Sequence, residues 1–222
     1  MKHLLTIGVA VGALITFGVV AQADPVVNEL LYNDAGTDDE EFCEIKGDPG
    51  LSLAGFTLVG VNGSNGLDYR TVALDGYSIN ASGYFVVGMD GVANVDLVDP
   101  GTWQNGPDKV ELRLNGSAVD GVCYGSSGNL VCEGGTFAPL VSEQSISRCP
   151  DGVDTNNNAD DFIATSTYTP GETNDCSGPV PPIDVNLCQI AENDANGLPV
   201  LDGVRVRVND VVALVASGVF RS

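Results

Sequence analysis

Short runs of alternating apolar and polar residues, each ended by glycine, asparagine or aspartate, fill this sequence from residue 25 to residue 125. Alternation places every second side chain on the same face, which is the period of a half-buried β-strand and not of a helix. No stretch sustains a helical period, and 28 glycines supply frequent turns. We therefore expect strands at 25–32, 41–46, 53–61, 69–74, 83–87, 109–114 and 119–124.

The clearest hairpin signal is Asn115-Gly116, which lies between the runs 109–114 and 119–124. This pair favours a two-residue turn because both residues adopt a positive φ readily. Within 41–46, alternation puts Phe42 on one face of the strand and Cys43 with Ile45 on the other. Many short strands joined by such turns predict an all-β fold, an antiparallel β-sandwich.

The N-terminus has the pattern of a secretory signal peptide, residues 1–23. A cationic start precedes an apolar stretch, and Ala21-Gln22-Ala23 offers small residues for cleavage before Asp24. The apolar stretch is nearly long enough to be a retained membrane anchor, but no cationic stop follows it. We expect cleavage, a mature chain without a membrane span, and a location that is extracellular, periplasmic or on the cell surface.

The charge of the mature chain excludes several classes of function. Removing Lys2 with the leader leaves 8 basic against 30 acidic side chains, a net charge of −22. Such a surface repels phosphate backbones, so nucleic-acid binding by this chain alone is not expected. The single histidine, His3, also leaves with the leader. Histidine-ligated zinc and histidine-dependent nucleophiles are therefore not expected either.

Six cysteines lie in the exported part: Cys43, Cys123, Cys132, Cys149, Cys176 and Cys188. An even number in an oxidising compartment indicates disulfides, although the count leaves their connectivity open. Cys149 and Cys176 flank one segment, and Cys123 and Cys132 flank a glycine-rich connection. Bridges across these two segments would leave Cys43 and Cys188, whose pairing would tie the C-terminal tail to the rest of the chain.

Six motifs follow one another in a recognisable order: VVNELLYN (26–33), EFCEI (41–45), LAGFTLVG (53–60), GYFVVG (83–88), NGPDKVELR (105–113) and VDGVCYG (119–125). Together they resemble the lamin tail domain. SISRCPDGVDTNNNADDF (145–162) and TPGETN (169–174) look like the closing segment of its bacterial secreted members. The resemblance covers residues 25–175 and implies an immunoglobulin-like β-sandwich. It transfers no catalytic residue, because the family has no agreed ones.

Two positions depart from the family pattern. Phe56 stands where the family usually has tryptophan, which changes core packing but not the fold. Cys43 stands at a usually aliphatic position, which suggests either a disulfide or a small buried thiol.

The C-terminal part divides from the rest at SGPVPP (177–182), which reads as a linker. We expect a lamin-tail-like domain over 24–176, a linker over 177–183 and an incomplete β-segment over 184–222. The stretch 192–220 is similar to the opening of an OB-fold-like domain. In some secreted bacterial nucleases, such a domain follows a lamin tail domain and precedes the catalytic one.

A candidate calcium loop lies within RCPDGVDTNNNADDF (148–162). Its candidate oxygen ligands are Asp151, Asp154, Asn156, Asn158 and Asp160. An EF-hand is excluded, because its sixth and twelfth positions would hold Ala159 and Thr165. The alternative is a structural turn in which these side chains cap their own backbone. No other cofactor is expected.

Two further groups invite a functional interpretation. The acidic run 38–41 follows Asp34 and could bind a cation, but an exposed acidic loop tip explains it as well. Trp103, Tyr69 and Tyr77 could form a sugar-binding platform, although a single tryptophan in a β-domain usually packs against the core.

These observations favour a secreted, non-catalytic module that binds an extracellular protein or a cell-surface partner. The alternative is the N-terminal accessory region of a secreted endonuclease whose catalytic domain is not in this chain.

Overall fold

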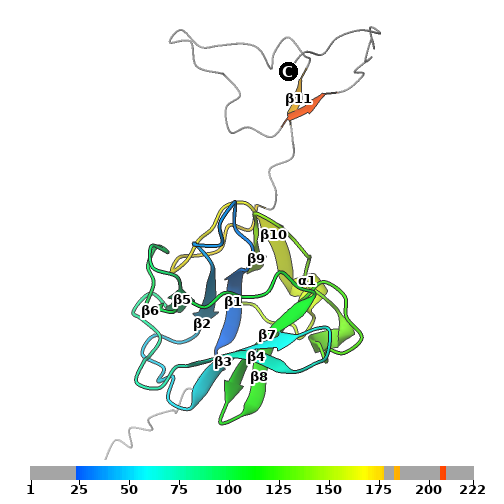
Figure 1. Ribbon diagram of the computed structural model, residues 1–222. Helices are drawn as coiled ribbons and strands as arrows, with labels where there is room; N and C mark the ends of the chain where they lie inside the picture. Colours follow the sequence, from blue (N-terminus) through cyan, green and yellow to red (C-terminus); the bar gives the residue numbers. More distant parts are fainter. Residues whose placement is uncertain (1–23, 178–182, 186–205, 209–222) are drawn as a thin grey trace, which may run out of the picture.

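The alternating runs form strands close to the expected positions in the computed structural model, which describes residues 24–177, 183–185 and 206–208 (Figure 1). Strand ends differ from the expected ones by at most three residues. The seven strands foreseen from the sequence are β1 (Val26–Leu31), β2 (Phe42–Lys46), β3 (Phe56–Asn62), β4 (Asp68–Ala73), β5 (Tyr84–Gly88), β7 (Asp108–Leu114) and β8 (Ser117–Tyr124).

One sheet has six strands in the order β10-β9-β1-β2-β5-β6. It adds β6 (Leu97–Val98), β9 (Ser145–Arg148) and β10 (Phe162–Thr165) to the expected strands. All its pairs are antiparallel except β5 with β6. β1 lies inside this sheet, between its sequence neighbour β2 and the distant β9 (Figure 1).

The second sheet has four antiparallel strands in the order β4-β3-β7-β8. Asn115 and Gly116 connect β7 to β8 and have φ values of 50° and 83°. The hairpin predicted at this pair is therefore confirmed. Its positive φ angles match the right-handed twist of the two strands.

The two sheets enclose one hydrophobic core, as expected of a β-sandwich. Leu30, Ile45 and Phe85 contribute from the six-stranded sheet, and Leu58 and Val110 from the four-stranded one. Cys43 faces this core and Phe42 faces away from it, as alternation predicts. Burial of apolar area on both sheets stabilises the sandwich at about 25 cal/mol per Å².

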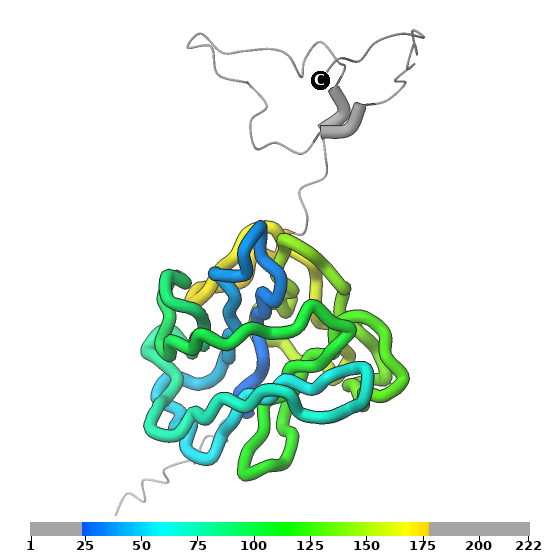
Figure 2. The backbone as a smooth tube through the Cα atoms, in the orientation of Figure 1, coloured from blue at the N-terminus to red at the C-terminus, as the bar shows by residue number. Residues whose placement is uncertain are grey.

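The outer face of the six-stranded sheet is covered by a segment near the end of the domain. Glu29 and Glu44 are buried there, and they accept hydrogen bonds from the backbone N–H groups of Thr169 (3.1 Å) and Gly171 (2.6 Å). Figure 2 shows this yellow segment beside the blue N-terminal hairpin. The start and end of the domain are thus joined through two buried carboxyl groups.

β9 was not foreseen because its buried side chains are largely polar. Ser145 and Ser147 are fully buried and donate to the Glu29 carboxylate (2.5 and 3.0 Å). A buried polar group is stable only when it is hydrogen-bonded, and this pairing depends on a residue more than a hundred positions away. Local sequence periodicity therefore could not reveal this strand. β10, Phe162–Thr165, was not foreseen either.

Beyond residue 177, the description is limited to a parallel pair, β11 (Ile183–Val185) and β12 (Val206–Val208). β12 lies within the β-segment expected over 184–222, whereas β11 begins at the last residue of the expected linker. The predicted signal peptide (1–23), most of the stretch predicted to resemble an OB-fold-like domain (192–220) and Cys188 lie outside the described residues.

Candidate functional site

Arg148 organises the stretch that the sequence singled out as a candidate calcium loop. Its side chain is fully buried on β9, and its guanidinium lies 4.6 Å from the centre of the Phe162 ring. Nη1 donates to Asp161 (2.9 Å) and Asp154 (3.0 Å), and Nη2 donates to Asp120 (3.2 Å). One buried cation is thus surrounded by three carboxylates.

The five candidate calcium ligands are engaged in separate protein contacts. Asp151 pairs with Lys46 (2.6 Å), and Asp154 pairs with Arg148 while accepting the Asn156 N–H (2.8 Å). Asn158 is buried, and its Oδ1 accepts the Cys123 N–H (2.8 Å). Asp160 accepts from the Asn157 side chain (2.6 Å). Only the bonds of Asp154 with Asn156 and of Asp160 with Asn157 lie within the stretch, as a structural turn requires, whereas Asp151 and Asn158 bond to distant parts of the domain. Calcium binding by this stretch stays a prediction.

An acidic pocket lies beside this stretch and includes only one of the five predicted calcium ligands, Asp154. Asp120, Glu133 and Asp154 each place one carboxylate oxygen within 4.8 Å of the other two. Burial, together with the charges of Asp120 and Asp154, raises the pKa of Glu133 to about 7 against the opposing charge of Arg148. Asp120 and Glu133 were not foreseen, because one comes from β8 and the other follows the Cys123–Cys132 bridge.

The charge of this acidic pocket is already opposed by protein cations. Arg148 contacts Asp120 and Asp154, and Lys109 lines the same cavity of about 280 Å³. Hard oxygen ligands of this kind suit calcium. Arg148 competes with a metal ion for the oxygens of Asp120 and Asp154, whereas the Lys109 ammonium donates to Glu111 (2.5 Å) and to the Val131 carbonyl (2.9 Å).

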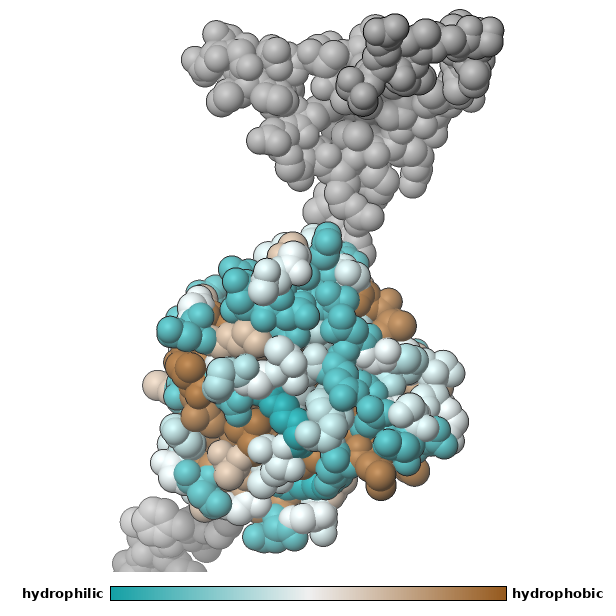
Figure 3. Space-filling view, in the orientation of Figure 1, coloured by the Kyte–Doolittle hydropathy of each residue, from teal (hydrophilic) through white to brown (hydrophobic). Residues whose placement is uncertain are grey.

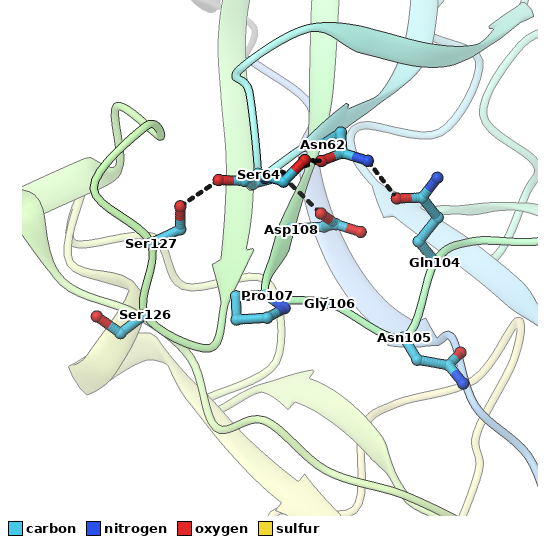
Figure 4. A pocket seen from close by; sticks show the side chains of 10 residues that line it. Asn62, Ser64, Gln104, Asn105, Gly106, Pro107, Asp108, Ser126 and Ser127 are labelled. Atoms are coloured by element: carbon cyan, nitrogen blue, oxygen red, sulfur yellow. Dashed lines mark hydrogen bonds between the residues drawn. The ribbon is translucent and has the colours of Figure 1, made fainter.

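A second cavity, which we call the polar groove, lies where three loops meet (Figure 4). Its volume is about 360 Å³. The loops follow β3, precede β7 and follow β8. They contribute amide and hydroxyl side chains: Asn62, Ser64, Gln104, Asn105, Ser126 and Ser127.

Hydrogen bonds between the loops fix the shape of the polar groove. Asn62 Nδ2 donates to Gln104 (2.8 Å), and the Gly63 N–H donates to the buried Asp108 carboxylate (2.6 Å). The Ser127 hydroxyl donates to the Gly63 carbonyl. A Cβ at Gly63 would lie only 2.0 Å from the Pro107 carbonyl oxygen, so this close approach requires glycine.

Two side chains of the polar groove have no hydrogen-bond partner in the protein. Asn105 and Ser126 are exposed, and within the described part of the chain neither side chain makes a hydrogen bond (Figure 4). The groove therefore offers preformed, uncharged donors and acceptors for a polar ligand. In the sequence, Asn62-Gly63 and Asn105-Gly106 gave only turn signals.

The three aromatic residues considered as a sugar platform are not arranged as one. Trp103 is buried, and the Arg70 guanidinium lies 4.0 Å from its ring centre. Tyr77 packs against Phe85, and the Tyr69 hydroxyl accepts the Gln104 N–H (3.1 Å). The expectation that Trp103 packs against the core is confirmed.

Two of the three suggested disulfides are present, Cys123–Cys132 and Cys149–Cys176. Both are typical of a non-cytoplasmic, oxidising environment. Cys43 is a free thiol, and its side chain lies in the core between the sheets. Cys188 lies outside the described residues, so the suggested pairing of Cys43 with Cys188 stays a prediction. The small buried thiol suggested by the family pattern is what the structure has.

Neither the surface of the protein nor comparison with known proteins identifies its function. Among the described residues, no helix is long and apolar enough to cross a membrane. On the face shown in Figure 3, hydrophobic residues lie in separate spots among hydrophilic ones. No known protein family, curated protein or solved structure matches this chain. The resemblance to the lamin tail domain therefore stays a prediction.

Proposed function

We propose that this chain is a secreted, non-catalytic module that binds an extracellular or cell-surface partner through the polar groove. The observation that carries the proposal is the convergence of three loops on one preformed cavity, lined mainly by amide and hydroxyl side chains together with the Asp108 carboxylate. A β-sandwich commonly carries its binding residues on the loops at one end of its sheets.

The composition of the polar groove supports recognition by hydrogen bonding. Asparagine, serine and glycine provide adaptable hydrogen bonds in the binding loops of antibody domains. Here the same residue types are held by contacts that involve Asp108 and Gly63, so the ligand meets an ordered surface. Preorganisation of this kind reduces the entropy lost on binding.

The compartment implied by the disulfides supports an extracellular partner. Both bridges form only under oxidising conditions, and the N-terminal sequence has the pattern of a cleaved leader. The strongly acidic surface favours solubility and disfavours direct contact with nucleic acid.

The proposal can be tested by measuring how much of the secreted protein stays on the cells that produce it. Asn105→Arg places a long charged side chain at the mouth of the polar groove. Thr71→Arg introduces the same side chain at an exposed position of β4, outside the groove. We expect wild type and Thr71→Arg to be retained on the cell surface and Asn105→Arg to be released into the medium.

Equal partition of all three proteins would contradict a role for the groove. Turnover of an ester, peptide, glycan or nucleic-acid substrate by the purified mature chain would contradict the non-catalytic part of the proposal.

A further inference from the structure

The loop between β1 and β2 contains five carboxylates, of which two turn inward. Asp34 is 4% exposed and Glu41 is 1% exposed, whereas Asp39 and Glu40 are exposed. The interpretation of the acidic run as a solvated tip therefore holds for its middle and is wrong for Glu41. Burial of carboxylates requires compensating contacts.

Each of the two buried carboxylates is satisfied at only one oxygen. Asp34 Oδ2 accepts the N–H groups of Asp39 (3.0 Å) and Glu40 (2.6 Å), and Glu41 Oε2 accepts the Trp103 N–H (2.5 Å). Asp34 Oδ1 and Glu41 Oε1 are buried and have no hydrogen-bond partner among the described residues. An unpartnered buried oxygen of this kind is rare in folded proteins and requires a physical explanation, of which a bound cation is one.

Arg70 does not bond to either unpartnered oxygen. It directs Nη2 to Asp99 (3.0 Å) and lies against the Trp103 ring, while its own Nη1 is buried and has no hydrogen-bond partner in the described part of the chain. This guanidinium therefore donates no hydrogen bond to Asp34 Oδ1 or Glu41 Oε1.

We propose that Asp34 Oδ1 and Glu41 Oε1 are ligands of a divalent cation of the calcium class, bound by the β1–β2 loop. Carboxylate oxygens are hard ligands that suit calcium, and extracellular modules bind it at about 10⁻⁴ to 10⁻³ M. The bound cation would supply the two unpartnered oxygens with the direct contact that Arg70 does not give them. This site is separate from the 151–160 turn and does not depend on the proposed binding function.

The lone tryptophan makes the site directly observable. Trp103 donates its backbone N–H to Glu41, so its ring lies close to a cation bound by that carboxylate. Terbium binds calcium sites and luminesces when a nearby excited indole transfers energy to it. We expect the mature chain, 24–222, to sensitise terbium luminescence on excitation of Trp103, and calcium to suppress this signal by competition.

Thermal unfolding with matched variants locates the cation. After EDTA treatment, we expect millimolar calcium to raise the Tm of wild type by several degrees. Asp34→Asn and Glu41→Gln should abolish this rise while still unfolding cooperatively in EDTA. Asp154→Asn, in the acidic pocket, should retain it.

The proposal is overturned by absence of both the terbium signal and the calcium shift. It is also overturned by a shift that Asp154→Asn abolishes and Asp34→Asn leaves intact, or by one that survives in all three variants. If a variant fails to fold, the terbium measurement on wild type tests the proposal by itself: absence of a Trp103-sensitised signal that calcium suppresses would overturn it.

Discussion

Replacing Arg148 with methionine tests whether the fold depends on its buried charge network. Methionine keeps much of the apolar volume over Phe162 but removes the guanidinium and its donors. Three carboxylate contacts, to Asp161, Asp154 and Asp120, and one to the Val27 carbonyl (3.1 Å) would be lost. The aspartates Asp120 and Asp161 are nearly fully buried, so water cannot replace the lost charge.

The size of the effect follows from these contacts. Hydrogen bonds to charged groups contribute about 1.5–3 kcal/mol each, so four of them give a gross upper bound of roughly 6–12 kcal/mol. Removing a buried arginine also removes its own desolvation penalty. Measured losses for breaking a buried ion pair are accordingly about 3–5 kcal/mol. For a domain of this size, that corresponds to a fall in Tm of roughly 6–20 °C.

Urea unfolding of Arg148→Met beside wild type measures this difference. The double variant Arg148→Met with Asp120→Asn should recover part of the loss, because it removes one uncompensated charge but keeps an acceptor for the Val27 N–H (2.5 Å). A loss below about 1 kcal/mol in the single variant, or no recovery in the double variant, would refute the role assigned to the network.

Three further predictions concern titration and cysteine chemistry. Burial raises the pKa of Glu44 to about 8 and that of Glu41 to about 7 from an ordinary value of 4.5. The folded chain therefore holds protons that the unfolded chain has released, and in calcium-free buffer its free energy of unfolding should fall as pH rises from 5 to 8. The slope from each group is at most about 1.4 kcal/mol per pH unit; a flat profile in urea unfolding would contradict this. Replacing both Cys149 and Cys176 with serine should lower the free energy of unfolding by about 3–4 kcal/mol, since their bridge spans 27 residues; an unchanged urea midpoint would rule this out. Cys43, whose thiol pKa is raised by burial, should resist iodoacetamide in the folded protein and react after denaturation, as read by peptide mass; rapid labelling of the native protein would show that the thiol is accessible.

Strands with a local apolar signal could be predicted, and strands with a polar interior could not. β7 and β8 were foreseen because Lys109–Leu114 alternates and Asn115-Gly116 determines its own turn. β9 was missed because its two buried serines are compatible with a strand interior only when Glu29 accepts their hydroxyl groups. The information that makes this strand stable lies in a distant part of the chain.

The candidate sites show the same division. Asp154 stood out because it lies in a dense polar segment, but its neighbours Asp120 and Glu133 come from other elements. The sequence drew attention to the acidic run, yet it could not distinguish Glu41, which is buried, from Glu40, which is exposed. That difference arises where β2 begins and the loop bearing Trp103 covers it. The polar groove was not foreseen, because turn residues give no sign of which loops will meet.

The interior position of β1 determines when a chain that emerges from its N-terminus can finish folding. One edge of β1 can pair with β2 soon after both are synthesised. The other edge can pair only after β9 is synthesised, since Ser147 of β9 follows Glu29 by 118 positions. Throughout that interval, backbone groups of Glu29 and Leu30 on the open edge have no strand partner. The N-terminal hairpin is therefore not a self-sufficient unit, and this sheet can close only after β9, near the end of the domain, has been synthesised.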